Sequence, residues 1–368
     1  MNVLIDIGDF DPKVGASNDM LDLAHYSQNN DTNFFVTGNI DKAHYPIFKA
    51  KGLKIISGRN IPFSRSALPI YFFSMLYWLF QLKRYQIDVI HINYISWGPS
   101  LAFASRLFNL PIVARAGGEY SIENKSVKWV SQYVANCHEQ ASHQLESPLK
   151  SKVNVVGDLV DIDRIARDRV KHSDVFSATE KQINILYVGQ ISERKGLHIL
   201  VKAFQEMSND VHLYLVGGDW KVPGFPQEIK SMLDKLECKN RVHLINHRTD
   251  AVSLINQSDI FILPSLSEAR PRVILEAMSL GKCIISTKVG GIPDMISHRE
   301  TGLLAEGNDV ASLAEQMLLA TDDSSLRETL GKNAAQYAET NLSPVKTATS
   351  YRKVYQNAIN EMTSHAKK

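Results

Sequence analysis

The stretch PSLSEARPRVILEAM, residues 264–278, decides how this chain folds. Residues 259–263, which are apolar after Asp259, predict a buried strand, and the mostly polar residues 264–270 predict a loop. A helix is expected to begin around Pro271, because proline suits the first helical turn. A buried strand that passes through a short loop into a helix indicates an α/β fold with a parallel sheet.

Two carboxylates bracket this expected helix start. Glu268 lies in the loop, and Glu276 follows eight positions later inside an apolar helix, where a carboxylate is costly unless it meets a specific polar partner. The free N–H groups and the positive end of a helix start suit a phosphate. We therefore predict a sugar-nucleotide site. The helix start would bind the diphosphate, and the two carboxylates would bind sugar hydroxyls on either side of it. The alternative is an ordinary loop acid followed by an exposed helical acid.

This segment resembles the Glu-x7-Glu motif of retaining glycosyltransferases of the GT-B fold, in particular glycosyltransferase family 4. The resemblance continues in the family's order through GK at 281–282, the strand 283–287, VGGIPD at 289–294 and TGLL at 301–304. It implies that Glu276 binds the ribose hydroxyls of a nucleotide and that Glu268 contacts the transferred sugar. It also implies that the residues between the two acids contact the donor, namely Arg270, Pro271, Arg272 and Val273. The resemblance is strong over residues 183–305 and extends to the first half by layout.

A second anion-binding segment is expected at residues 187–196, YVGQISERKG. A strand end, the flexible Gly189, a basic pair and a second glycine at a helix start suit an anion. The segment resembles a Gly-Arg…Lys-Gly motif whose basic residues bind phosphates, so Lys195 would neutralise the leaving diphosphate. Gln190 occupies the arginine position of that motif, and our hypothesis is that Arg194 supplies the missing charge. The alternative is a solvated lysine in an ordinary turn.

Gly217 ends the next expected strand, where a glycine lets the backbone approach a ligand closely. A plain tight turn explains it equally well. Two Asp-x-Asp sequences are candidates for a metal-binding motif, and neither follows a strand of the second half. DFD at 9–11 leads into the first loop, and DID at 161–163 resembles a helix start. We therefore expect no metal ion and no other cofactor.

The first half departs from the family pattern. Gly15 is the best match to an expected glycine pair after the first strand, and Gly117 stands where many members have a functional histidine. Arg115 and Glu119 are polar groups that would contact donor or acceptor, unless they form a surface ion pair. His91 ends an apolar strand and is an acceptor-side candidate with Glu119; a core histidine is the alternative.

Composition narrows the classes of function. The chain has 368 residues with 44% apolar residues, enough for two domains with substantial cores. Lys and Arg total 41 and Asp and Glu 39, so a net charge of +2 gives no reason to expect nucleic-acid binding. Three widely spaced cysteines and a start without signal-peptide features favour a cytoplasmic protein.

Strand and helix signals alternate along both halves, which indicates parallel sheets. In the first half, strands are expected at 3–7, 33–37, 53–57, 88–92, 111–115, 133–136 and 153–156, with helices at 18–27, 67–84, 100–108 and 139–146. In the second half, strands are expected at 183–188, 211–216, 241–245, 259–263 and 283–287, with helices at 197–207, 226–236, 250–257 and 272–280. The polar run 164–182 between the halves predicts a domain boundary.

Doubly wound α/β domains bind ligands at the carboxyl ends of their strands. The resemblance implies the GT-B arrangement, in which two Rossmann-like domains face each other across a cleft and the last helix returns to the first domain. We therefore expect an acceptor-binding domain at 1–170, a donor-binding domain at 171–342 and a returning helix at 343–368.

Residues 68–84 are apolar on most sides of a helix and too short to span a bilayer. Burial in the domain core is the favoured interpretation, because such helices are usually buried. The alternative is a helix in the membrane interface, with Tyr71, Tyr77 and Trp78 at headgroup depth and Lys83 and Arg84 at its end.

The resemblance implies a retaining, metal-independent glycosyltransferase, with Glu268, Lys195 and Arg115 as candidate catalytic residues. Its partners would be a nucleotide-sugar donor and a glycan or lipid-linked glycan acceptor, with peripheral membrane contact at the inner face of the cytoplasmic membrane as an option. Surface polysaccharide or glycolipid assembly is the expected setting. Two alternatives remain: an inactive module that binds sugar nucleotides, or another enzyme of this fold such as a sugar-nucleotide epimerase.

Overall fold

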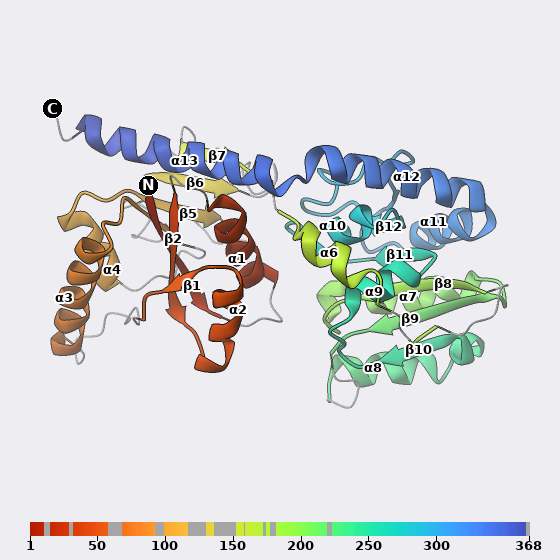
Figure 1. Ribbon diagram of the computed structural model, residues 1–368. Coiled ribbons are helices and arrows are strands. Elements are labelled where there is room, and N and C mark those ends of the chain that lie inside the picture. The colour runs from red at the N-terminus through yellow and green to blue at the C-terminus, as the bar shows by residue number, and fades with distance from the viewer. Residues whose placement is uncertain are drawn as a thin grey trace. The chain divides into compact units, whose positions relative to one another are not determined.

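A computed structural model of the protein describes residues 1–10, 15–28, 32–57, 68–92, 99–116, 130–135, 152–157, 159–171, 174–176, 182–218 and 223–365. The chain forms two compact units, each drawn with its own sheet in Figure 1. The first contains Met1–Leu159 and Pro344–Lys368, and the second contains Val160–Ser343.

The boundary between the units lies earlier than residue 170, where the polar composition had placed it. Val160 and Ile165 are buried in the hydrophobic core of the second unit. The helix that carries Ile165, α6 (Ile162–Asp168), is therefore part of that unit despite its polar sequence. The last helix, α13 (Pro344–His365), belongs to the first unit.

The first unit is built on a parallel sheet whose described strands run in the order β3-β2-β1-β4-β5-β6-β7. The strands are β1 (Asn2–Asp9), β2 (Asn33–Asn39), β3 (Lys54–Ile55), β4 (Val89–Ile92), β5 (Ile112–Ala116), β6 (Gln132–Ala135) and β7 (Val153–Val155). The helices are α1 (Gly15–Ser27), η1 (Lys42–His44), α2 (Tyr45–Ala50), α3 (Leu68–Arg84), α4 (Pro99–Leu107) and α13.

Helices cover both faces of this sheet, which is why its strands are continuous apolar runs. On one face, Trp78 and Leu82 of α3 and Leu101 of α4 pack in one core cluster. On the other face, side chains of α1 and α13, such as Leu21 and Tyr355, pack in a second cluster. The helix expected at 139–146 lies outside the described residues.

The second unit repeats this plan with a parallel sheet in the order β10-β9-β8-β11-β12-β13. Its strands are β8 (Ile183–Val188), β9 (Val211–Val216), β10 (Val242–Ile245), β11 (Ile260–Leu263), β12 (Cys283–Thr287) and β13 (Leu303–Ala305). Its helices are α6, η5 (Glu193–Lys195), α7 (Leu197–Ala203), η6 (Phe204–Glu206), α8 (Phe225–Leu233), η7 (Glu237–Arg241), α9 (Ala251–Gln257), α10 (Arg272–Ser279), α11 (Val310–Asp322) and α12 (Ser324–Asn341).

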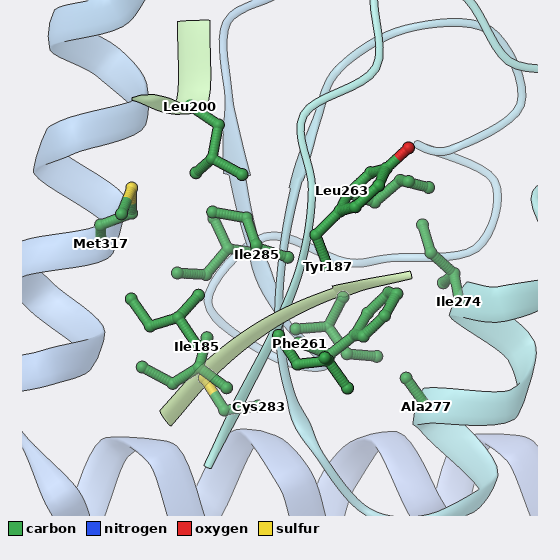
Figure 2. Close-up of a cluster of buried hydrophobic side chains, with 14 of the residues drawn as sticks. Ile185, Tyr187, Leu200, Phe261, Leu263, Ile274, Ala277, Cys283, Ile285 and Met317 are labelled. Atoms are coloured by element: carbon green, nitrogen blue, oxygen red, sulfur yellow. The ribbon is translucent and has the colours of Figure 1, made fainter. Parts of the chain in front are cut away.

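The core of the second unit fixes α10 against the sheet. Figure 2 shows Ile274 and Ala277 of α10 facing Phe261 of β11, while Ile285 of β12 lies toward Met317 of α11. All of these side chains are fully buried. Dense packing of this kind holds the start of α10 in a fixed place at the end of β11. The helix expected at 272–280 is therefore confirmed.

Candidate active site

The site expected from the two sequence segments lies at the carboxyl edge of the second sheet. β8 pairs with β9 on one side and with β11 on the other, so the chain changes its winding direction between β8 and β11. Open α/β sheets bind ligands outside the carboxyl ends of the strands at such a switch point. The loop after β8 carries Lys195, and the loop after β11 carries Glu268.

These two loops meet through an ion pair. Lys195 Nζ donates to Glu268 Oε1, and Ser265 Oγ donates to the same carboxylate oxygen over 2.9 Å. The side chains of Lys195 and Glu268 are only 13% and 9% exposed. A second link joins the backbones, because the Leu266 N–H donates to the Arg194 carbonyl over 2.8 Å. The structure thus brings together Lys195, which the sequence analysis assigned to the leaving diphosphate, and Glu268, which it assigned to the transferred sugar.

A glycine makes this close approach sterically possible. Gly196, the residue after Lys195, has a φ of 69°, in the left-handed region that favours glycine. A Cβ atom at this position would lie 1.9 Å from the Pro264 carbonyl oxygen. The second glycine of the motif is therefore required by the packing of one loop on the other.

Gly189 and Gly217 form a similar crossing at the ends of β8 and β9. Gly217 has a φ of 148°, and a Cβ atom there would lie 1.7 Å from the Gly189 carbonyl oxygen. Beside them, the Tyr187 hydroxyl donates to the Gln190 carbonyl over 2.6 Å. Burial, and after it the nearby Glu268 carboxylate, raises the pKa of Tyr187 well above its usual range. Tyr187 is therefore a neutral hydrogen-bond donor in this site.

Arg194 lies on the outer side of the ion pair. Its Nη1 atom donates to the Ser267 carbonyl over 2.8 Å and lies 3.6 Å from Glu268 Oε2. Half of its side chain is exposed, in contrast to Lys195. Gln190, in the motif's arginine position, is also exposed. The position of Arg194 is consistent with the hypothesis that it supplies positive charge here.

Glu276 has the specific polar partners that its apolar surroundings demand. The carboxylate is buried in α10, where Ile274, Leu275, Ala277 and Met278 are buried as well. Arg164 Nη2 donates to Glu276 Oε1, and Arg272 Nε lies 3.5 Å from the same oxygen. A buried carboxylate between two guanidinium groups is well compensated.

Arg164 was not singled out in the sequence analysis. It lies on α6, whose first turn is capped because Asp161 Oδ1 accepts from the Arg164 N–H over 2.9 Å. Only an indirect signal in the sequence could have found it. Glu276 required a cation, and the arginine-rich segment 162–169 at the start of the same unit could supply one.

The start of α10 completes this edge of the sheet. Pro271 is its N-cap residue, with φ −72° and ψ 114°, and no side-chain hydrogen bond caps the helix among the described residues. The first turn of α10, whose N–H groups have no intrahelical partner in an ideal helix, carries Arg272 and the partly buried Val273, and Arg270 precedes it. Such a terminus carries partial positive charge and suits an anion.

The remaining candidates lie in the first unit. Arg115 is buried at the end of β5 and pairs with Asp19 of α1 over 3.1 Å, so it is not part of a surface ion pair. His91 is fully buried, and its Nδ1 atom lies 2.7 Å from the Tyr355 hydroxyl of α13. This arrangement favours the alternative of a core histidine.

Burial, and after it the charge of Arg115, lowers the pKa of His91 to about 3. His91 is therefore neutral near pH 7. Gly15 is the first residue of α1, and Glu119 lies outside the described residues. Among the described residues, no group of three or more His, Cys, Asp and Glu side chains could hold a metal ion.

Comparison with known proteins identifies the second unit. Residues 168–337 match the family model Glycosyl transferases group 1. The chain is 26% identical over 222 residues to N-acetyl-alpha-D-glucosaminyl L-malate synthase of Bacillus anthracis. The aligned segment covers 60% of this chain and 57% of that protein. It is also 31% identical over 165 residues to the capsular polysaccharide biosynthesis glycosyltransferase CapM of Staphylococcus aureus. This aligned segment covers 43% of this chain and 41% of that protein.

The chain spans about half the length of the curated relatives it matches first. The fold is similar along the whole chain to Anabaena HepE in complex with UDP, with a TM-score of 0.80, 21% identity, and coverage of 96% of this chain and 99% of that one. The expected GT-B fold is thereby confirmed. This chain carries a domain of the glycosyl transferases group 1 family.

Proposed function

We propose that the protein is a retaining, metal-independent glycosyltransferase that moves a sugar from a nucleotide-diphosphate sugar to an acceptor hydroxyl. The observation that carries this proposal is the partly buried Lys195–Glu268 pair, set between the ends of β8 and β11 beside the start of α10. A cation, a helix terminus and two separate carboxylates match the parts of a sugar nucleotide: phosphates, transferred sugar and ribose.

Each residue then has a defined task. Lys195 and the first N–H groups of α10 stabilise the negative charge that develops on the diphosphate as its bond to the sugar breaks. Arg194 adds positive charge at the outer side of the site. Glu268 accepts hydrogen bonds from the transferred sugar, and Glu276 accepts them from the ribose, held in place by Arg164 and Arg272.

The reaction needs no protein nucleophile in this proposal. The bond between the anomeric carbon and the phosphate oxygen breaks, and the acceptor oxygen forms its new bond to that carbon on the same face. The departing phosphate oxygen takes the proton of the acceptor hydroxyl. Arg115 and Glu119 remain candidate contacts of donor or acceptor from the first unit, and Gly15 and Gly217 remain candidate points of close backbone approach.

The substrates are proposed from the chemistry and from the relatives. UDP is bound by Anabaena HepE, which makes UDP and UDP-sugars the first donors to test here. The similarity to CapM supports a glycan or lipid-linked glycan acceptor and a role in surface polysaccharide or glycolipid assembly. We further propose that the protein works in the cytoplasm at the inner face of the cytoplasmic membrane. None of the helices that the structure describes is long and apolar enough to cross a bilayer.

Calorimetric titration with UDP, GDP and their sugar conjugates tests the donor site. Wild type should bind one nucleoside diphosphate class, Lys195→Ala should lose most of that affinity, and Lys202→Ala, an exposed lysine on α7, should bind like wild type. Equal binding by the two variants, or no binding by wild type, would contradict the proposal. Transfer in the presence of EDTA and the anomeric configuration of the product test metal independence and retention.

The exposed Gln190 at the motif's arginine position favours one alternative, a module that binds sugar nucleotides without transferring the sugar. Such a module would bind UDP and lose affinity on Lys195→Ala as above. It would release no UDP from any donor sugar, even with glycan acceptors present. Release of UDP above the rate measured for Lys195→Ala would exclude it.

A further inference from the structure

The helix α3 exposes a stripe of large apolar side chains. Ile70, Phe73, Leu76 and Phe80 recur every three or four residues, and Phe73 and Phe80 are 70% and 61% exposed. The opposite stripe, which contains Trp78 and Leu82, is buried in the core of the first unit. The favoured expectation of core burial is therefore correct for one side of this helix and wrong for the other.

The neighbouring helix α4 extends this apolar surface. The two helices pack side by side at one end of the first unit, where Ser74 Oγ donates to Ser100 Oγ over 3.1 Å (Figure 1). On α4, Phe103 and Leu107 are exposed. We call the exposed side chains Ile70, Phe72, Phe73, Leu76, Phe80, Phe103 and Leu107 the α3–α4 face. Soluble monomers seldom expose so many large apolar groups on adjacent elements without a partner.

The charged side chains that α3 and α4 themselves carry have one sign. The sequence contains no Asp or Glu at 68–87 or at 99–118, whereas Lys83, Arg84 and Arg106 lie on these two helices. All three basic side chains belong to exposed residues, and the Arg84 guanidinium lies 6.0 Å from the ring centre of Phe80. Aromatic groups with basic groups at their edge match the interface of an anionic bilayer.

We propose that the α3–α4 face docks onto an anionic lipid surface. The exposed phenylalanine and leucine side chains enter the boundary between headgroups and acyl chains, and Lys83, Arg84 and Arg106 pair with lipid phosphates. A second copy of this chain fits the face poorly, because the charged groups on α3 and α4 of two such faces would meet as like charges. The inference concerns the first unit and does not depend on sugar transfer by the second.

Vesicle co-sedimentation tests this proposal on the full-length protein. Wild type should bind vesicles of phosphatidylcholine with phosphatidylglycerol more tightly than vesicles of phosphatidylcholine alone. The double variant Lys83→Gln, Arg84→Gln should lose about fivefold in affinity per basic residue on the anionic vesicles only. The double variant Phe73→Gln, Phe80→Gln should lose at least roughly tenfold on the anionic vesicles, because the apolar side chains no longer enter the interface.

A matched control separates docking from general loss of apolar surface. Val345→Gln removes a 62% exposed apolar side chain from α13 of the same unit and should bind vesicles like wild type. Unchanged circular dichroism and melting temperature show that each variant is folded. The proposal is overturned if the Phe73 and Phe80 variant binds as tightly as wild type, or if Val345→Gln loses as much. It is also overturned if sedimentation velocity shows that the Phe73 and Phe80 variant breaks a dimer while wild type binds no vesicles.

Discussion

Replacing Gly196 by alanine tests whether the loop after β8 is locked onto the loop after β11. At a φ of 69°, a residue with a Cβ atom costs about 1–2 kcal/mol. The new Cβ atom would lie 1.9 Å from the Pro264 carbonyl oxygen, so one of the two backbones has to move. Overpacking of this kind costs roughly another 1–3 kcal/mol. We therefore expect Gly196→Ala to destabilise the second unit by about 2–5 kcal/mol.

Gly281 provides a matched control for the backbone cost alone. Its φ is 65°, nearly that of Gly196, and a Cβ atom there would meet its nearest neighbours at 3.5 Å and 3.6 Å, which is ordinary contact. Gly281→Ala should therefore cost only about 1–2 kcal/mol. It lies two residues beyond α10, away from the start of the helix. The difference between the two variants isolates the clash with Pro264.

The displaced loop should also impair the proposed chemistry. A shift of Pro264 moves Glu268 relative to Lys195, and misplacement by about 1 Å can lower turnover on the order of 10²-fold. Thermal unfolding measures the stability change, at roughly 2–4 °C per kcal/mol for a unit of this size. Calorimetric titration with UDP measures donor affinity. If Gly196→Ala and Gly281→Ala melt together and both bind UDP like wild type, the two loops are not locked in the way described.

Three further outcomes are expected. Lys195→Ala should lower the rate of sugar transfer by about 10²–10³-fold, because the leaving diphosphate loses a preorganised positive charge beside it. Lys202→Ala should retain full activity, and initial rates with a UDP-sugar measure both. Glu268→Gln should bind UDP more tightly than wild type, because Lys195 loses its competing carboxylate, and it should transfer sugar at least about tenfold more slowly. Tighter UDP binding without slower transfer would show that Glu268 does not contact the sugar. His91→Gln should flatten the acid side of the stability curve. The folded pKa of His91 is about 3, against an ordinary value of 6.5, so the unfolded state takes up protons first as the pH falls. The contribution of the neutral His91 is complete above about pH 6.5 and is lost toward pH 3 at up to ~1.4 kcal/mol per pH unit. Urea midpoints at several pH values measure this slope, and an unchanged slope in the variant contradicts the assignment.

The alternation of strands and helices was predictable because its cause is local. Parallel strands covered on both faces are continuous apolar runs, as in Ile183–Val188 and Ile260–Leu263, and these signals need no knowledge of the fold. The importance of Gly196 and Glu276 was visible for the same reason. A glycine that follows a basic pair at a helix start marks an anion-binding turn, and an acid in an apolar helix conflicts with its immediate neighbours.

Partners that are distant in the sequence were not predictable. Arg164 lies 112 positions from Glu276, and Tyr355 lies 264 positions from His91. Neither pair leaves a local pattern, because an ion pair or a hydrogen bond constrains only two side chains. The apolar sequence of α3 also did not reveal which of its sides the core would cover. Trp78 and Phe73 are both large aromatic residues, and only the position of the sheet makes one buried and the other exposed.

The pairing of both site carboxylates with protein cations has a consequence for the proposed reaction. A diphosphate that binds Lys195 competes with Glu268, whose side chain is only 9% exposed. A largely desolvated carboxylate that loses its cation is costly unless a hydroxyl group takes the place of that cation. A sugar nucleotide can supply both the phosphate for Lys195 and a sugar hydroxyl for Glu268. A free nucleoside diphosphate supplies the phosphate but no sugar hydroxyl for Glu268, because its ribose hydroxyls are assigned to Glu276. Recognition of the diphosphate and of the sugar is therefore coupled through Glu268. Once the sugar has left, the carboxylate regains its advantage for Lys195, which favours release of the nucleotide product.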